Sequence, residues 1–366
     1  MSAANPARPE GAEEMPQATR LDDVRIRQVR PLISPALLQF ELPADESVQA
    51  FVERSRAEVA AIVHGRDPRL LAIVGPCSIH DHAQAIEYAK RLRVLADELR
   101  QDLLLVMRVY FEKPRTTVGW KGFINDPRLD GSFRINEGLR LARQLLLEVA
   151  QLGLPAGTEF LDLLSPQYIS DLISWGAIGA RTTESPSHRQ LASGLSCPIG
   201  FKNGTDGGVQ MAADALVAGS ASHAFMGMTK MGQAAVFETS GNGDCHIILR
   251  GGSRGPNYSA ADIEAACAIL RKSSVTERVM VDCSHANSAK DYRRQPEVAR
   301  DIAQQLQAGE RRILGVMIES HLQPGRQDLK PGMPPAPGVS ITDGCIGWAQ
   351  TEEVLRGLAA AVRARG

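Results

Sequence analysis

Short apolar runs alternate with helical patterns from residue 70 to the end of the chain. Nine runs have the length of buried strands: 70–75, 103–109, 157–161, 177–181, 197–202, 222–228, 246–250, 279–283 and 313–318. Eight further stretches repeat apolar residues at helical spacing: 82–100, 131–152, 166–175, 185–195, 207–218, 260–272, 295–308 and 351–364. Parallel strands that are joined by helices are buried on both faces and read as continuous apolar runs. The alternation therefore predicts an α/β fold.

Eight such repeats in roughly 300 residues favour a closed (β/α)8 TIM barrel over residues 70–366. One strand candidate is surplus, because residues 222–228 and 246–250 are joined without a helical pattern. We expect an inserted β-hairpin there, at about 229–245, near the sixth unit. The alternative is an open doubly wound sheet, which predicts a Gly-rich dinucleotide-binding turn after the first strand. The string GPCSIH at 75–80 is not such a turn.

The chain before residue 70 follows a different pattern. Residues 1–20 are rich in Pro, Glu and Ala and offer little apolar surface, so we expect them to be disordered. Residues 21–69 predict an N-terminal arm, in which 21–30 alternates apolar and charged residues like an edge strand. Helical spacing follows from Val48 to Val63.

Composition narrows the class of protein. The 366 residues are 43% hydrophobic and 23% charged, as in ordinary globular chains. The net charge is -1, so no overall positive field predicts nucleic acid or an anionic membrane as a partner. No apolar run reaches the roughly 18 residues of a membrane span, and residues 1–20 lack the apolar core of a secretory signal. Six scattered cysteines without a CxxC pair suit a reducing compartment, so we expect a cytoplasmic protein.

Reactive side chains gather just after the strand candidates, where the active sites of such barrels lie. The strings are GPCSIHD (75–81), RVYFEKPRTTVGWKG (108–122), GARTTES (179–185), GFKNGTDG (200–207), ILRGG (248–252), DCSHANS (282–288), VMIESH (316–321) and SITDGC (340–345). One set in them is basic: Arg108, Lys113, Arg115, Arg181, Lys202 and Arg250. Any one of these residues suits a structural ion pair equally well. Six at one barrel mouth indicate phosphorylated substrates with more than one anionic group.

A second set combines a thiol, an imidazole and two carboxylates: Cys77, His285, Glu319 and Asp343. Mixed S, N and O ligands suit one borderline divalent ion such as Mn, Fe, Co or Zn. Spacing alone leaves open a packed cysteine and a helix-capping aspartate. Cys283, two residues before His285, would face the same side of a strand and could compete as a ligand.

The strings GPCSIHD, KPRTTVGWKG, GARTTES, GFKNGTDG, ILRGG, DCSHANS and SITD resemble those of type I 3-deoxy-D-arabino-heptulosonate 7-phosphate (DAHP) synthases. The similarity to this microbial, aromatic-amino-acid-regulated branch runs from about residue 21 to the C-terminus. It implies a metal-dependent condensation of phosphoenolpyruvate with erythrose 4-phosphate, the first step of the shikimate pathway toward chorismate and the aromatic amino acids.

The resemblance also implies roles for individual residues. The metal ligands are Cys77, His285, Glu319 and Asp343, with Cys283 behind them. The phosphoenolpyruvate pocket comprises Arg108, Lys113, Glu159, Ala180, Arg181, Lys202 and Arg250, and the erythrose 4-phosphate contacts are Arg115 and Thr116. Catalysis rests on Lys113, Cys77 and His285. Lys113 is placed to protonate the developing alkoxide, and we expect its pKa to be lowered by Arg108 and Arg115.

Regulation is a further implication of the resemblance. An aromatic amino acid would bind away from the chemistry, against the N-terminal arm of a neighbouring subunit. The matching residues are Asp22 and Asp23 of the arm and Pro166, Gln167, Leu191, Leu195, Ser196, Phe225 and Gly227 of the pocket wall. The apolar ones would equally suit ordinary helix packing. Gly227 favours tyrosine over phenylalanine or tryptophan, because relatives that sense phenylalanine tend to carry Ser there. A homodimer or homotetramer is expected.

Three other functions remain as alternatives. A 3-deoxy-octulosonate 8-phosphate synthase would use a similar barrel, but the KPRT string and the long arm argue against it. A barrel that has lost catalysis would lack Lys113 or a metal ligand, and all are present. A Schiff-base aldolase would form a borohydride-trappable adduct on Lys113 or Lys202, and we expect none.

Overall fold

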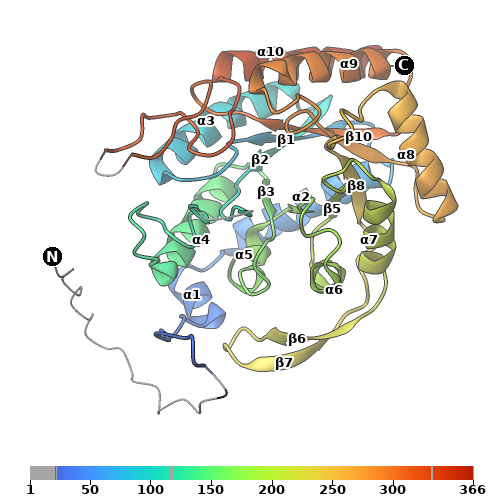
Figure 1. The fold of residues 1–366 in the computed structure, drawn as a ribbon. Coiled ribbons are helices and arrows are strands. Elements are labelled where there is room, and N and C mark those ends of the chain that lie inside the picture. The colour runs from blue at the N-terminus through green and yellow to red at the C-terminus, as the bar shows by residue number, and fades with distance from the viewer. Residues whose placement is uncertain (1–20, 22, 116–118, 331–332, 366) are drawn as a thin grey trace.

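A computed structural model of the chain describes residues 21, 23–115, 119–330 and 333–365. The predicted disorder of residues 1–20 lies outside the described residues, as do Asp22 and Thr116. Within the described residues, eight parallel strands close into a barrel in the order β1-β10-β9-β8-β5-β4-β3-β2 (Figure 1). Their bounds are β1 (Leu70–Gly75), β2 (Leu103–Arg108), β3 (Ala156–Glu159), β4 (Trp175–Ile178), β5 (Ile199–Lys202), β8 (His246–Leu249), β9 (Val279–Asp282) and β10 (Ile313–Glu319). The predicted (β/α)8 barrel is confirmed.

The first and last barrel strands pair directly, and this pairing brings together segments more than 200 residues apart in the sequence. Leu71 lies opposite Gly315, and Gly75 lies opposite Glu319. A side chain at Gly315 would meet the Leu71 carbonyl oxygen at 2.4 Å, so a glycine is needed where these strands approach. The strings that follow β1 and β10 are therefore neighbours at the barrel mouth.

Helices surround the barrel and bury their apolar faces against it (Figure 1). They are α3 (His82–Leu99), α4 (Ile135–Gln151), α5 (Pro166–Ile169) with the short η1 (Ser170–Leu172), α6 (Pro186–Gly194), α7 (Gln210–Ser220), α8 (Ala260–Lys272), α9 (Gln295–Gln307), preceded by η2 (Tyr292–Arg294), and α10 (Trp348–Ala364). Side-chain caps fix several starts. Asp81 accepts a hydrogen bond from the Gln84 amide at α3, and Ser259 and Asp262 form a capping box at α8.

The surplus strand candidate belongs to an antiparallel hairpin outside the barrel. Strand β6 (Ala224–Met228) pairs with β7 (Ala234–Glu238), and β8 is the sixth barrel strand. The hairpin thus begins at 224 rather than at the predicted 229, and it ends at 238. The side chains of β6 are exposed or half-buried, unlike the fully buried barrel strands. A short apolar run does not by itself distinguish these two situations.

The second helix of the N-terminal arm covers the end of the barrel at which the strands begin. The arm contains α1 (Pro35–Glu41) and α2 (Glu46–Val63). Val59, Ile62 and Val63 of α2 pack with residues that fill the barrel, such as Trp175. The edge strand predicted at 21–30 is wrong for the described residues of that segment, which form a turn and irregular chain. Alternation without a neighbouring strand does not make a sheet.

In the part of the chain that the structure describes, no helix is both long and apolar enough to cross a bilayer.

Candidate active site

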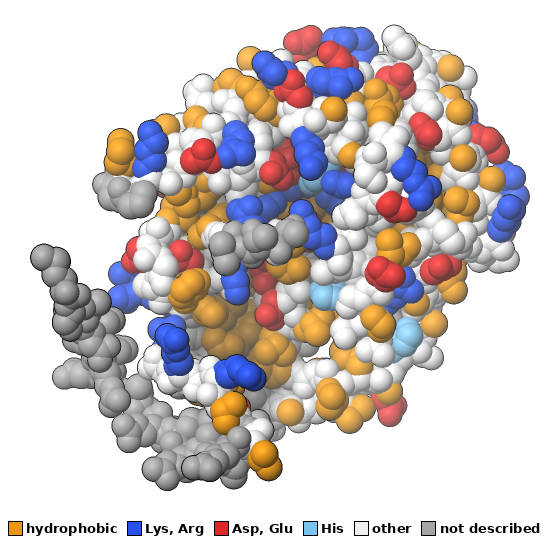
Figure 2. Space-filling model, in the orientation of Figure 1, with side chains coloured by type: hydrophobic (Ala, Val, Ile, Leu, Met, Phe, Trp, Pro, Cys, Tyr) orange, Lys and Arg blue, Asp and Glu red, His pale blue; other side chains and the backbone are white. Residues whose placement is uncertain are grey.

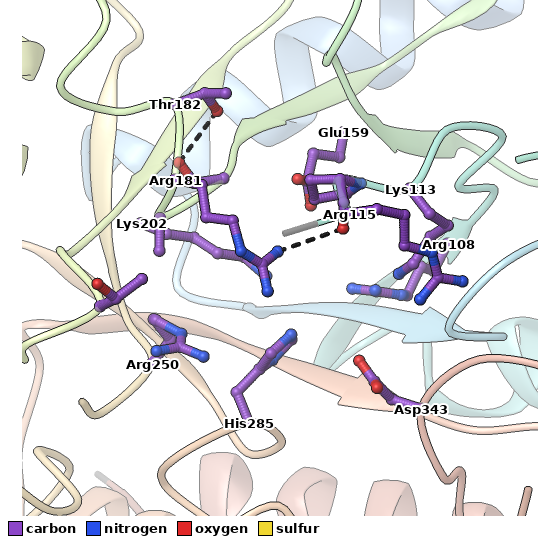
Figure 3. Close-up of a pocket in the computed structure, with 14 residues that line it drawn as sticks. Arg108, Lys113, Arg115, Glu159, Arg181, Thr182, Lys202, Arg250, His285 and Asp343 are labelled. Carbon is purple, nitrogen blue, oxygen red and sulfur yellow. Dashed lines mark hydrogen bonds between the residues drawn. The ribbon is translucent and has the colours of Figure 1, made fainter. Parts of the chain in front are cut away.

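A charged cavity of about 120 Å³ lies at the carboxyl ends of the barrel strands (Figure 3). It is lined by Arg108, Lys113, Pro114, Arg115, Glu159, Gly179, Ala180, Arg181, Thr182, Lys202, Thr205, Arg250, His285 and Asp343. All described members of the predicted substrate-binding set are among these residues. The structure therefore brings together residues from seven of the eight barrel strands and the segments that follow them.

Two of the cations are held by buried ion pairs. Lys202 donates to the Asp282 carboxylate at 3.1 Å, and Arg108 donates to Glu319 at 2.8 Å. The Arg108 guanidinium also lies 3.6 Å from the centre of the Tyr110 ring. A buried charge is tolerated when it is paired, and pairing also fixes its direction. These two cations are thus positioned before any ligand arrives.

Among the described residues, Arg181 and Arg250 have no such ion pair. Burial lowers the pKa of Arg250, and the nearby Arg181 lowers it further. Arg181 donates to the Pro114 carbonyl at 3.5 Å. Two guanidinium groups close together, one of them destabilised by burial, form a site for a dianion.

Room for the Glu159 carboxylate depends on a glycine. A Cβ at Gly179 would lie 2.4 Å from a Glu159 carboxylate oxygen. Glu159 ends β3 and is buried at the cavity wall. Any other residue at 179 would push this carboxylate out of its place.

Lys113 lies against Cys77. Its ammonium donates to the Cys77 carbonyl oxygen at 3.0 Å and to the thiol sulfur at 3.1 Å. Burial and Arg108 lower the pKa of Lys113, but the charges of Cys77, Glu319 and Asp343 outweigh them and raise it. The predicted lowering is therefore wrong, because acidic neighbours surround this lysine more closely than basic ones. Arg115, expected to lower it as well, turns its Nε toward the Trp120 carbonyl.

A group of possible metal ligands lies next to this lysine. Among the described residues, one ligand atom each from Cys77, Glu319 and Asp343 lies within 4.8 Å of the others. Burial, followed by Glu319, raises the pKa of the Cys77 thiol to about 11. Thiolate and carboxylate oxygens around one point are a donor set that a borderline divalent cation satisfies. The residues thus fit a divalent metal, whose binding would displace the thiol proton.

His285, the fourth predicted ligand, is not part of that group of three. Its Nδ1 pairs with Asp282 at 2.9 Å and contacts the Ser284 hydroxyl at 2.7 Å. The residue has a left-handed backbone with φ +55°, and it lines the cavity together with Asp343 (Figure 3). A carboxylate on Nδ1 leaves Nε2 with the lone pair, as in a metal-ligating histidine.

Cys283 does not compete with His285. Strand β9 ends at Asp282, so the alternation of side chains that would place Cys283 and His285 on one side does not extend to them. Cys283 is fully buried in the main hydrophobic cluster and is absent from the described group of possible ligands. The expectation of a competing ligand at Cys283 is therefore wrong for the described residues, and its place behind the ligands stays a prediction.

Sequence reasoning missed Asp282. This carboxylate is completely buried and accepts hydrogen bonds from the Ser284 amide and hydroxyl. Burial raises its pKa, but His285, Lys202 and Ser284 outweigh burial and hold the pKa well below the ordinary value. The signal was present, because an acidic residue at the carboxyl end of a barrel strand is costly unless it is paired.

A second cavity, of about 890 Å³, lies between α5, α6 and the hairpin. Figure 2 shows the hollow above the hairpin, with hydrophobic side chains on its floor. Its lining includes all seven predicted wall residues: Pro166, Gln167, Leu191, Leu195, Ser196, Phe225 and Gly227. Asp23 has a left-handed backbone and does not line this cavity within the single chain.

Comparisons with known proteins agree with this architecture. Residues 43–356 match the family described as the DAHP synthetase I family. The chain is similar to three phospho-2-dehydro-3-deoxyheptonate aldolases: Phe-sensitive from Escherichia coli K12 (56% identity, 94% of this chain and 98% of that one), tyrosine-inhibited from Schizosaccharomyces pombe (52%, 94% and 94%) and Trp-sensitive from Escherichia coli O157:H7 (52%, 94% and 99%). A solved aldolase of this name from Francisella tularensis SCHU S4 superposes with a TM-score of 0.91 at 50% identity, over 93% of this chain and 99% of that one.

Proposed function

The chain belongs to the DAHP synthetase I family and is a DAHP synthase, a transferase, and on that premise we propose how its two cavities work. The charged cavity condenses phosphoenolpyruvate with erythrose 4-phosphate to give DAHP and inorganic phosphate, at the entry to the shikimate pathway. The observation that carries this proposal is the convergence of six cations and a group of possible metal ligands on one barrel mouth.

Phosphoenolpyruvate carries a phosphate and a carboxylate, and the cavity offers cations for both. Arg181 and Arg250 receive the phosphate, and Lys202 and Arg108 lie deeper in the cavity for the carboxylate end. Arg115, at the exposed rim, receives the phosphate of erythrose 4-phosphate. This assignment holds the two substrates with their reacting carbon atoms between them.

The site would hold one divalent ion, of Mn, Fe, Co or Zn. Cys77, Glu319 and Asp343 would bind it, and His285 would be the fourth protein ligand. When bound, it supplies Lewis-acid polarisation of the aldehyde. Cys77 and Glu319 are buried, whereas Asp343 is exposed, so the position is open to solvent on the Asp343 side.

Lys113 supplies the proton. C3 of phosphoenolpyruvate bonds to the aldehyde carbon, and the Lys113 ammonium protonates the alkoxide oxygen that forms. Water then adds to the electron-poor C2 and loses one proton, which balances the proton that Lys113 gave up. The C2–O bond to phosphate breaks, the C2 hydroxyl becomes the ketone, and its proton leaves with inorganic phosphate. The Lys113 ammonium, 3.1 Å from the Cys77 sulfur, lies beside the proposed metal position and thus near the oxygen that it protonates.

The second cavity binds an aromatic amino acid that inhibits the enzyme, and we favour tyrosine over tryptophan or phenylalanine. A side chain at Gly227 would meet the Phe237 ring at 2.3 Å, so the glycine lets this ring lie against β6. Phe237 lines the same cavity. The glycine therefore sets the shape of the cavity wall. The similar relatives include Phe-sensitive, tyrosine-inhibited and Trp-sensitive enzymes at 52 to 56% identity, so identity alone does not select the effector.

The arm and the hairpin join copies of the chain into a homodimer or homotetramer. Leu21, Val24 and Ile26 of the arm are exposed, as are Met226 and Val236 of the hairpin. Apolar side chains gathered on extended segments mark an interface. The arm, residues 21–69, then brings Asp22 and Asp23 of one copy toward the second cavity of another. All six cysteines are free and buried, in keeping with a cytoplasmic enzyme.

Product analysis tests the reaction. Purified protein with Mn²⁺ and phosphoenolpyruvate should form DAHP and phosphate with erythrose 4-phosphate, and negligible product with arabinose 5-phosphate. Activity with arabinose 5-phosphate alone would assign an octulosonate synthase instead. Borohydride treatment should leave the mass of the peptides with Lys113 and Lys202 unchanged, and a trapped adduct would assign a Schiff-base mechanism.

A further inference from the structure

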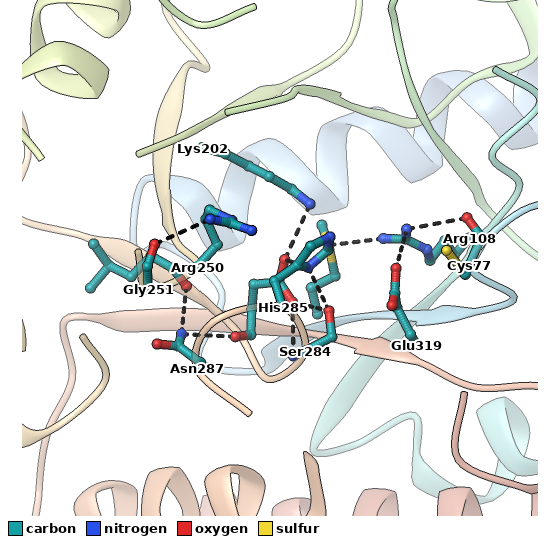
Figure 4. Close-up of polar contacts among 12 residues, drawn as sticks. Cys77, Arg108, Lys202, Arg250, Gly251, Ser284, His285, Asn287 and Glu319 are labelled. Atoms are coloured by element: carbon teal, nitrogen blue, oxygen red, sulfur yellow. Dashed lines mark hydrogen bonds and ion pairs between the residues drawn. The ribbon is translucent and has the colours of Figure 1, made fainter. Parts of the chain in front are cut away.

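A single carboxylate oxygen connects the metal ligands to the substrate cations. Oδ2 of Asp282 accepts from Lys202 Nζ at 3.1 Å and pairs with His285 Nδ1 at 2.9 Å. Its other oxygen accepts from the Ser284 hydroxyl at 2.6 Å. Figure 4 shows Lys202, Ser284 and His285 converging at this point. Asp282 is completely buried, so water does not share the charge of this oxygen.

Sharing one oxygen makes the two partners compete. A cation on Nε2 of His285 strengthens the hydrogen bond that Nδ1 donates to its carboxylate. The Asp282 charge is then more fully taken up by the imidazole, and less of it remains to neutralise Lys202. An ammonium with a weaker counterion attracts an anionic substrate more strongly, and the low polarity around Asp282 enlarges the effect.

We propose that Asp282 is a positioning residue that couples metal binding to phosphoenolpyruvate binding by transferring its charge between Lys202 and His285. This inference rests on the proposed function. It adds that the metal raises substrate affinity through the protein, apart from any contact of its own with the substrate. By linkage, phosphoenolpyruvate raises metal affinity by the same factor.

The decisive variant is Asp282→Asn. It keeps the shape of the side chain and removes its charge, so Lys202 is no longer neutralised. Calorimetric titration of metal-free and Mn²⁺-loaded protein with phosphoenolpyruvate gives the ratio of the two dissociation constants. We expect the metal-free protein to have a dissociation constant about fivefold or more above that of the Mn²⁺-loaded protein in the unaltered chain, and less than about twofold above it in the variant. The ratio should fall because the metal-free variant binds phosphoenolpyruvate at least as tightly as the unaltered metal-free protein. Separately, the Mn²⁺ affinity of the variant should drop about 10- to 100-fold.

A merely structural role would give a different pattern, since a distorted site loses affinity for both ligands together. Weaker phosphoenolpyruvate binding by the metal-free variant, or an unchanged ratio, overturns the proposal. As a matched control, Glu310→Gln removes an ion-paired carboxylate, the partner of Arg312, far from the barrel mouth. It should change neither dissociation constant.

Ser284→Ala is a second variant that should move the ratio of dissociation constants in the opposite direction. It keeps the proposal testable if Asp282→Asn does not fold. Loss of the Ser284 hydroxyl removes its 2.6 Å hydrogen bond to Asp282, which leaves more charge on Asp282 for Lys202, and it also removes the 2.7 Å contact with His285 Nδ1. The metal-free protein should then bind phosphoenolpyruvate about twofold more weakly, and the ratio should rise. A ratio that falls or stays constant contradicts the proposal. If the unaltered protein binds no phosphoenolpyruvate with or without metal, the proposed function itself fails.

Discussion

The two cavities are built in different ways. The charged cavity lies on strand ends, and buried ion pairs such as Lys202 with Asp282 fix its cations. The second cavity is several times larger and lies between short helices and an exposed hairpin. Strands of a closed sheet are held by neighbours on both sides, whereas β6 and β7 pair with each other alone among the described strands, and the turn between them is held by the Ala36 amide, which donates to the Lys230 carbonyl. This difference supports our proposal that the charged cavity carries out the chemistry and that the second cavity binds the effector.

The largest expected effect is the loss of turnover when Cys77, a proposed metal ligand, is replaced, compared with replacement of Cys283, which packs in the core. Cys77→Ala should lower kcat by more than about 100-fold and abolish stoichiometric metal binding, because one of the donors at the group of three is lost. Cys283→Ala is the matched control, because this buried thiol lies in the hydrophobic cluster. It should keep turnover within about fivefold and lower stability by about 1 to 2 kcal/mol. Turnover assays and metal analysis decide, and near-normal activity of Cys77→Ala would remove it from the ligand set.

The next effect is a pH dependence of stability caused by Glu112, a buried carboxyl between residues of the two cavities. Glu112 directly precedes Lys113, and it accepts a hydrogen bond at 2.8 Å from Ser165, the neighbour of Pro166. Burial raises the pKa of Glu112 to about 7, with Asp162 adding to the shift. The unfolded chain loses this proton near pH 4.5 and the folded protein only near 7. Stability from the neutral carboxyl is therefore present at low pH and is lost as the pH rises between these values.

Glu112→Gln removes this dependence. Relative to the unaltered protein, the variant should gain up to about 3 kcal/mol of unfolding free energy between pH 5 and pH 8. Urea unfolding at both pH values measures the difference. If the unfolding free energies of the variant and the unaltered protein differ by the same amount at both pH values, Glu112 does not titrate in this range. The carboxyl would then not distinguish the region between the two cavities.

Filling the second cavity gives a smaller effect, confined to regulation. Ser196 is exposed at the cavity wall, so Ser196→Trp should occupy the space without disturbing the core. The dissociation constant of the inhibitory amino acid should rise more than about tenfold by calorimetry. Arg115→Ala, at the rim of the charged cavity, serves as the control and should leave that constant unchanged. Equal binding to Ser196→Trp would place the effector elsewhere.

Salt gives the smallest effect. Raising NaCl from about 50 to 300 mM should weaken phosphoenolpyruvate binding about two- to fivefold, because its site consists of charges partly open to solvent. Binding of an aromatic amino acid, which depends on apolar burial, should change less than twofold. Similar salt dependence at the two cavities would contradict the difference that we draw between them.

Most of the fold followed from periodicity, and the charged site followed from strand ends. Arg108, Lys202 and Arg250 could be placed together because a closed parallel barrel collects the carboxyl ends of its strands. The hairpin bounds could not be placed, because the composition of 224–228 matches that of a buried strand. The N-terminal alternation misled for a related reason, since pairing depends on a neighbour that the local sequence does not reveal.

Electrostatic detail was the least predictable part of the site. The sequence shows Arg108 and Arg115 flanking Lys113, whereas the fold places Cys77, Glu319 and Asp343 around its ammonium. The pKa of Lys113 therefore moves in the opposite direction. Asp282 was overlooked because its two partners come from separate strings, and only closure of the barrel brings Lys202 within 3.1 Å of it.

The most direct test of the central claim is phosphate release from phosphoenolpyruvate and erythrose 4-phosphate by metal-stripped protein. We predict no release in the presence of EDTA, full recovery on addition of Mn²⁺, and inhibition by one aromatic amino acid. Turnover that is indifferent to EDTA would contradict a metal held by Cys77, Glu319 and Asp343. No turnover with any restored metal would contradict the assignment of the charged cavity as the catalytic site.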